Sequence, residues 1–244
     1  MCRSEPQILV LVIFTSTFHD DTAHDVTSMR DQLSEFIAAP QFPCVGAKSA
    51  LCRHRMRFAE YGALSSRADA ASLCAELVAF AAEFPEPGHV PVSLVAMFRE
   101  QMPDEVAFEG ALWDHLQAMH EADRSQFEWD AMVDSDPSKS DFSMSIGGRA
   151  FFVVGLHPAA SRLARQAPFP CLVFNFHDQF ESLKRSGKYQ TMQAAIRVRD
   201  IALQGSVNPV LSKFGDASEA RQYAGRSVGP DWVCPFHAGK AGHG

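Results

Sequence analysis

The stretch Phe142-Ser-Met-Ser-Ile-Gly-Gly-Arg-Ala-Phe-Phe-Val-Val-Gly155 decides the fold class of this chain. Phe142, Met144 and Ile146 alternate with polar residues, which is typical of a half-buried strand. The Gly147-Gly148 pair suits a two-residue turn, and an apolar run follows it. The sequence therefore predicts a β-hairpin here.

Helices and further strands are expected on both sides of this hairpin. Apolar spacing and helix-stop residues predict helices over Met29–Ile37, from Pro43 to a stop at Gly62, over Leu73–Phe84, over Phe108–Asp123, from a cap at Asn175 to Arg185, and from Met192 to a stop at Gly205 before Pro209. Strands are predicted over Val90–Phe98 and Cys171–Phe174. Because no regular βαβ alternation occurs, we expect an α+β fold, a single domain with several helices packed on a small, mainly antiparallel sheet.

Composition and charge exclude several classes of protein. The chain has 244 residues, of which 46% are hydrophobic and 21% charged, so it is globular rather than disordered. Its net charge of -7 disfavours a nucleic-acid partner. The apolar run Ile8–Phe14 is too short to cross a bilayer and lacks a clean cleavage site. We expect no membrane partner and a cytoplasmic protein, with residues 1–28 as a variable N-terminal extension of a domain over residues 29–244.

The motif content excludes further classes. The six cysteines contain no CxxC pair, so neither a disulfide framework nor a covalent c-type haem is expected. GxGxxG, GxxxxGK[ST], GxSxG and HExxH are absent, which removes the common dinucleotide, P-loop, serine-hydrolase and zinc-protease patterns.

Cys44 is the first candidate for chemistry. Pro43 fixes the backbone directly before a predicted helix, so Cys44 lies where free N–H groups and the helix dipole favour a thiolate. Lys48, one turn further on, adds positive charge. A thiolate here could act as a nucleophile or a metal ligand. The alternative is a small buried apolar residue, the commonest role of a free cysteine.

Three histidines are further candidates. His120 lies on the apolar face of its predicted helix, with Asp123 placed to orient it. His157 ends a strand just before Pro158, and His177 lies in the first turn of a helix. Each could serve as a ligand or acid–base group, or could be an ordinary core or capping residue.

Charged residues beside apolar segments form the third group. The guanidinium groups of Arg149, Arg162 and Arg165 match carboxylates in shape. Glu109, Glu181 and Asp200 are candidate partners for a guanidinium ligand. For each of these residues, the alternative is a solvated helix face or an internal ion pair.

These segments, in their order, resemble the YqcI/YcgG family. The resemblance runs from about Met29 to His237, and residues 1–28 do not contribute to it. The matching stretches are FPCVGAKSAL from Phe42, FEGALWDHLQAMHEAD from Phe108, FSMSIGGRAFFVVGLHP from Phe142, ASR from Ala160, FNFHDQFE from Phe174, IRVRD from Ile196 and CPFH from Cys234.

Similar members of that family are haem-dependent N-oxygenases that hydroxylate guanidine nitrogens of arginine or arginine-derived compounds, often in natural-product pathways. The resemblance therefore implies haem b (iron protoporphyrin IX), a small guanidine-containing substrate, and dioxygen with an electron donor or peroxide. It leaves open the exact substrate, the redox partner, the axial ligand and whether the chain forms a homodimer.

Oxygen activation on haem needs one strong protein ligand and one open face. We expect His157, and after it Cys44, as the iron ligand, with His120 and His177 as catalytic proton donors. Lys48, Arg149 and Arg162 are then the expected propionate partners, and Glu109, Glu181 and Asp200 the expected substrate-binding carboxylates.

Two other functions stay open at this point. A haem-binding sensor or carrier would share the ligand and the arginines but need no acidic substrate pocket. A cofactor-free thiol enzyme would use Cys44 as its nucleophile.

Overall fold

The computed structural model describes residues 27–88, 90–207 and 218–239, and its centre is a five-stranded sheet in the order β1-β2-β5-β4-β3. The strands are β1 (Met56–Tyr61), β2 (Ser93–Phe98), β3 (Met144–Ile146), β4 (Arg149–Leu156) and β5 (Cys171–Phe176). β1 and β2 are parallel, and the other three pairs are antiparallel. The α+β fold with a mainly antiparallel sheet is thus confirmed.

The predicted hairpin is present as β3 and β4. Ile146 pairs with Arg149, and Gly147 and Gly148 have φ angles of 62° and 69° in the turn between them. The Gly147 N–H donates to Asp123 Oδ1 at 2.9 Å, which ties the turn to the end of a helix. The hairpin therefore places β4 beside β5 near the middle of the sheet.

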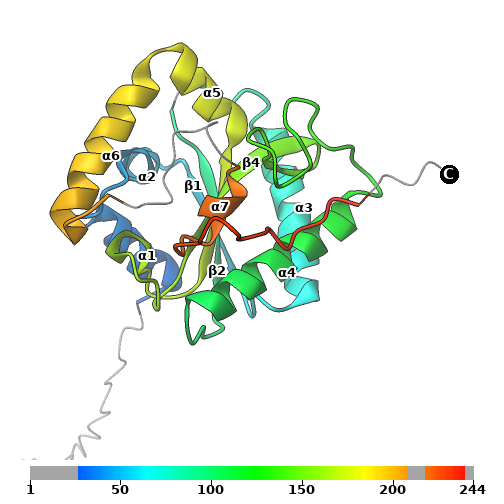
Figure 1. Cartoon of the computed structure of the whole chain (residues 1–244), viewed down its shortest axis with the longest axis horizontal. Coiled ribbons are helices and arrows are strands. Elements are labelled where there is room, and N and C mark those ends of the chain that lie inside the picture. The colour runs from blue at the N-terminus through cyan, green and yellow to red at the C-terminus, as the bar shows by residue number, and fades with distance from the viewer. Residues whose placement is uncertain (1–26, 89, 208–217, 240–244) are drawn as a thin grey trace, which may run out of the picture.

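Two long helices, α3 (Arg67–Glu83) and α4 (Glu105–Asp123), cover one face of the sheet (Figure 1). Their buried side chains pack with alternate residues of the strands, such as Phe151 and Phe174, in the larger core cluster. α4 lies very close to β4, because a Cβ atom on Gly155 would come within 2.6 Å of the Phe108 ring. The side chains between these helices and the sheet therefore form the main hydrophobic core.

The opposite face is covered less tightly. It carries α1 (Met29–Ala38), α2 (Val45–Cys52), the short 3-10 helix η1 (Leu163–Arg165), α5 (His177–Arg185) and α6 (Lys188–Gln204), while α7 (Ala220–Tyr223) lies near β4 (Figure 1). Alternate strand residues such as Val95 and Met97 pack here against α1 and the start of α2 in a smaller core cluster. Because both faces are covered, every residue of β2 is buried.

Two local predictions are wrong. The helix expected from Pro43 to Gly62 ends at Cys52, and β1 begins four residues later at Met56. His54, with a φ of 53°, makes the turn between them. Phe58 therefore lies in a strand, where pairing with β2 overrides the helical spacing.

Asn175 does not cap α5. It belongs to β5, and the N-cap residue is Phe176, which makes no side-chain capping bond. The Asn175 side chain instead donates to the Phe152 carbonyl and accepts from the Ser93 hydroxyl. The other predicted elements are present within a few residues, whereas Ile8–Phe14 and Pro209 lie outside the described residues.

Candidate ligand-binding site

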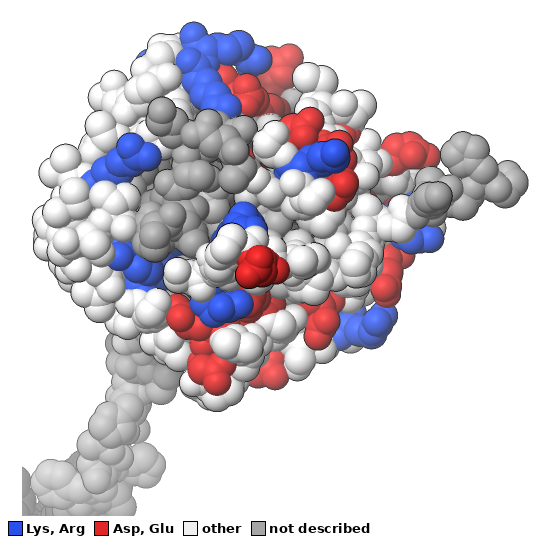
Figure 2. All heavy atoms as spheres, viewed as in Figure 1, with Lys and Arg blue, Asp and Glu red and all other residues white. Residues whose placement is uncertain are grey.

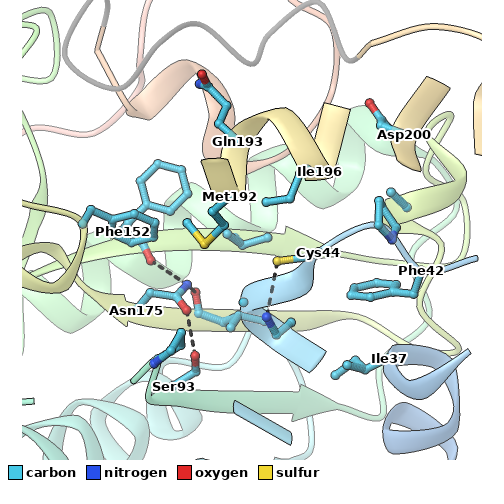
Figure 3. A pocket seen from close by; sticks show the side chains of 18 of the residues that line it. Ile37, Phe42, Cys44, Ser93, Phe152, Asn175, Met192, Gln193, Ile196 and Asp200 are labelled. Carbon is cyan, nitrogen blue, oxygen red and sulfur yellow. Dashed lines mark hydrogen bonds between the residues drawn. The ribbon is translucent and has the colours of Figure 1, made fainter. Parts of the chain in front are cut away.

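A cavity of about 290 Å³ lies between the sheet and the helices of the second face. Its floor consists of strand residues, and its walls come from the start of α2, from η1, and from α5 and α6 (Figure 3). The floor includes Met56, Phe152, Val154, Val173 and Asn175. A mostly apolar hollow with a few polar groups is the usual form of a small-molecule site.

Cys44 lines this cavity at the N-cap of α2 (Figure 3). Its Sγ accepts a hydrogen bond from the Ala47 N–H at 3.4 Å. Burial raises the pKa of the Cys44 thiol above its ordinary value, while the N–H groups of Ala47 and Gly46 and the charge of Arg165 act in the opposite direction. In the ligand-free protein these surroundings favour the protonated thiol. The same N–H groups could donate hydrogen bonds to a thiolate that is bound to a metal.

One side of the cavity is basic. Arg162 and Asp200 form an ion pair at 2.7 Å, with side chains only 9% and 5% exposed. Arg162 also donates to the hydroxyl and the carbonyl of Ser206. Both side chains line the cavity. Asp200, predicted to bind a guanidinium substrate, therefore already holds a guanidinium of this chain.

Arg165 is buried beside this pair. It donates to the backbone carbonyls of Gly155, Gln222 and Tyr223 at 2.8 to 3.3 Å. Burial lowers its pKa to about 10, so the guanidinium is still charged at neutral pH. From the sequence, Arg165 was a candidate only together with Arg162 and had no separate predicted role.

Helix α6 contributes a polar stripe of which only Asp200 was a candidate from the sequence. Tyr189, Gln193, Arg197 and Asp200 line the cavity at helical spacing, together with the apolar Met192 and Ile196. In Figure 3, Met192 lies between α6 and the sheet, whereas the Gln193 side chain points away from the strands. The i, i+4 spacing of these residues was the available signal. It was missed for Tyr189, Gln193 and Arg197, because Asp200 was the one polar residue of this helix that entered the prediction.

The three candidate histidines are not among the described residues that line the cavity. His157 is 1% exposed, and its ring stacks on Phe108 with centroids 4.2 Å apart. Within the described residues, neither of its ring nitrogens has a hydrogen-bond partner. Desolvation lowers its pKa to about 4. The structure therefore places His157 as a neutral ring in the interior.

His120 and His177 lie in other surroundings. The Nε2 atom of His120 is 2.6 Å from the Ala238 carbonyl, in a cluster with Trp129 and Phe236. His177 Nδ1 lies 3.4 Å from the buried carboxylate of Glu219. Ser143 donates to the same carboxylate at 2.9 Å. Glu219 was not anticipated from the sequence, because nothing in its local pattern marks it as buried.

The remaining predicted propionate and substrate partners lie elsewhere. Lys48 donates to carbonyls at the end of α1, and Arg149 binds Asp178 at 2.8 Å. Glu109 is held by Arg226 and by Trp232 Nε1, and Glu181 pairs with Lys184. None of these four side chains is among the residues described as lining the cavity. The structure therefore brings together Cys44, Arg162, Arg165 and Asp200 and separates the other candidates from them.

A porphyrin needs an apolar slot, an axial ligand and cations for its two propionates. The cavity supplies an apolar floor, the Cys44 Sγ and the guanidinium groups of Arg162, Arg165 and Arg197, so the lining chemistry fits this group. Its volume is near the lower end for small-molecule sites, about 300 Å³. Binding a whole porphyrin therefore requires the cavity walls to move apart.

The described residues contain no cluster of His, Cys, Asp and Glu that could hold a metal ion by itself. No described helix combines the length and apolar character of a membrane span. Acidic and basic side chains are interspersed over the face drawn in Figure 2, which shows no continuous basic area on its described part.

The fold and the cavity together define an α+β protein with a mostly apolar cavity between its sheet and its helices. The model of the YqcI/YcgG family matches residues 33–237, and the chain belongs to that family. Neither the curated proteins nor the solved structures gave a significant match.

Proposed function

We propose that this protein is a haem-dependent N-oxygenase that hydroxylates a guanidine nitrogen of arginine or of an arginine-derived compound, with the porphyrin in the cavity. The observation that carries the proposal is the position of Cys44. Of the two candidate iron ligands, Cys44 lines the cavity, and His157 is not among its described lining residues. We therefore place Cys44 before His157 as the iron ligand.

A thiolate ligand suits oxygen activation, because it donates electron density that favours cleavage of the O–O bond. When bound, the haem would supply this oxygen chemistry. The N–H groups of Ala47 and Gly46 would hold the negative sulfur in place. The apolar floor of the cavity would exclude water from the reacting face.

The overall reaction converts an N–H bond to N–OH. With dioxygen it consumes two electrons and two protons and releases one water, and with hydrogen peroxide it releases one water without further reductant. Asp200 is the acidic side chain among the described cavity residues, so it is the proposed anchor for the substrate guanidinium. Because Arg162 already binds it, the substrate would have to share the carboxylate with Arg162.

One observation favours the second candidate, a haem-binding sensor or carrier. Glu109 and Glu181 are paired with other residues away from the described cavity lining, and Asp200 is paired within it. A protein that only binds haem needs no carboxylate for a guanidinium. The raised pKa of Cys44 disfavours the third candidate, a cofactor-free thiol enzyme.

The decisive experiment incubates haem-loaded protein with isotope-labelled arginine and peroxide, or dioxygen with a reductant, and detects the added oxygen by mass spectrometry. We expect hydroxylated product from the wild type, none from Cys44→Ala, and much less from Asp200→Asn. Glu181→Gln is the matched control outside the described cavity lining and should retain activity. Haem binding without product from a panel of guanidine compounds would favour the sensor or carrier.

A further inference from the structure

The charges that line the cavity do not balance. Its described lining holds three arginines, Arg162, Arg165 and Arg197, and one carboxylate, Asp200. Arg162 takes that carboxylate in the buried ion pair. Two guanidinium groups are therefore left in the wall without a carboxylate among the described residues.

Of these two guanidinium groups, that of Arg165 lacks a counter-charge most clearly. Its described hydrogen-bond partners are backbone carbonyls of Gly155, Gln222 and Tyr223, which accept N–H bonds but carry no net charge. An ionised group that is removed from water is strongly destabilised unless an opposite charge accompanies it. Asp200 and Cys44 act on Arg165 only through space. A buried cation of this kind favours an anion from the ligand.

The guanidinium of Arg165 is also held in place. Gly225 has a φ of 81°, and a Cβ atom there would lie 3.1 Å from Arg165 Nη1. The chain thus packs its backbone directly against the guanidinium. A fixed, planar donor group loses little freedom when it binds a carboxylate.

Arg197 adds a second cation from the α6 side of the cavity. It lies on α6, one turn after Gln193 and three residues before Asp200, and its side chain is half-buried at the cavity. Within the described residues it makes no ion pair with a carboxylate. Two such arginines above an apolar floor match a ligand with an apolar body and carboxylates at its edge.

We propose that Arg165 and Arg197 bind the carboxylates of the cavity ligand, in place of the Lys48 and Arg149 expected from the sequence. This inference rests on the proposed function, in which those carboxylates are the porphyrin propionates. The rival role for Arg165 is to stabilise a thiolate at Cys44, on which its charge also acts.

The experiment compares the binding of haemin and haemin dimethyl ester, which has no free carboxylate, by absorption titration. We expect the wild type to prefer haemin by about tenfold to hundredfold, the range for one or two charge-assisted hydrogen bonds. Arg165→Gln and Arg197→Gln should each weaken haemin binding about tenfold and leave ester binding unchanged. Arg149→Gln, outside the described cavity lining, is the matched control and should behave as the wild type.

Arg165→Gln could fail to fold, because Arg165 ties three backbone segments together. Its circular dichroism and unfolding curve are therefore measured first, and Arg197→Gln on the more exposed helix carries the test if Arg165→Gln is unfolded. Equal binding of haemin and its ester by the wild type would overturn the inference and leave the proposed function standing. An equal loss for both porphyrins in each variant would also overturn it, and in Arg165→Gln would point to the Cys44 role.

If neither porphyrin binds, the proposed function fails, and the arginine site is decided with 8-anilinonaphthalene-1-sulfonate, an apolar body with one anionic group. Fluorescence binding by the wild type that is weakened about tenfold in the Arg197→Gln variant would support the anion site. Binding that is absent, or equal in both proteins, would overturn it.

Discussion

The Sγ atom of Cys44 accepts a hydrogen bond from the backbone N–H of Ala47, 3.4 Å away across the first turn of α2. This contact directs the helix N-terminus at a sulfur that combines an N-cap position with a place in the cavity lining. The same N–H group can stabilise a thiolate once a metal ion compensates the cost of burial. Without that compensation, burial dominates and raises the pKa of the thiol.

Cys44 should therefore react slowly with alkylating reagents in the ligand-free protein. We expect iodoacetamide at pH 7 to label the exposed Cys52 at least about tenfold faster than Cys44, because only the thiolate is the nucleophile. Peptide mapping by mass spectrometry over a time course measures both rates in one sample, so Cys52 serves as the internal control. Faster labelling of Cys44 would instead support the thiol-enzyme function.

The Arg162–Asp200 pair should contribute strongly to stability. Asp200→Asn leaves the buried Arg162 guanidinium without its carboxylate, and breaking such a pair from one side costs about 3 to 5 kcal/mol. Urea unfolding followed by circular dichroism measures the loss. The double variant Arg162→Gln with Asp200→Asn should recover part of it. A single variant as stable as the wild type would mean that the pair is open to solvent.

His157 should make the fold sensitive to acid. Its pKa is about 4 in the folded protein against an ordinary 6.5, so between these values the unfolded chain binds the extra proton. Stability should therefore fall as the pH drops from about 6.5 to about 4, by roughly 2 to 3 kcal/mol from this group. The slope of unfolding free energy against pH should become shallower in His157→Phe. Identical slopes in this window would show that the ring is not buried and neutral.

Two glycine substitutions should separate folding from binding. Gly155→Ala places a Cβ atom 2.6 Å from the Phe108 ring, so we expect a destabilisation of about 1 to 3 kcal/mol or more.

Gly46→Ala meets only ordinary contacts, the nearest 3.7 Å from Met192 Sδ, and should fold as well as the wild type. Because that methyl group lies between Cys44, Met192 and Pro91, it should weaken haemin binding. Unfolding curves of both variants, compared with the wild type, measure the change in stability, and haemin titrations measure the change in affinity. Tight haemin binding by Gly46→Ala would place the porphyrin away from Cys44.

The sequence was sufficient for most elements but not for the composition of the site. The hairpin at Gly147-Gly148 and the helices around Leu77 and Leu116 follow from local periodicity and turn chemistry, and these are present. Cys44 was recognisable because Pro43 and the following helix are adjacent to it in sequence. Each of these features can be predicted from a few residues that are adjacent in the sequence.

The partners across the site could not be predicted in the same way. Asn175 was interpreted as a helix cap, yet pairing of β5 with β2 and β4 places its amide between Ser93 and Phe152. Arg165 and Asp200 were both visible as charged residues, but only the fold shows which of them are neutralised. Such long-range pairings depend on topology, which periodicity along one segment does not encode.

The most direct test of haem binding at Cys44 is the absorption spectrum of protein purified with added haem, reduced under carbon monoxide, for the wild type and Cys44→Ala. The account predicts a Soret band in the wild type that moves to about 450 nm with carbon monoxide, as thiolate ligation gives, and is lost or shifted in Cys44→Ala. A maximum at about 420 nm that is unchanged in Cys44→Ala and lost in His157→Ala would contradict it. The absence of any Soret band, even after haemin is added, would contradict haem binding altogether.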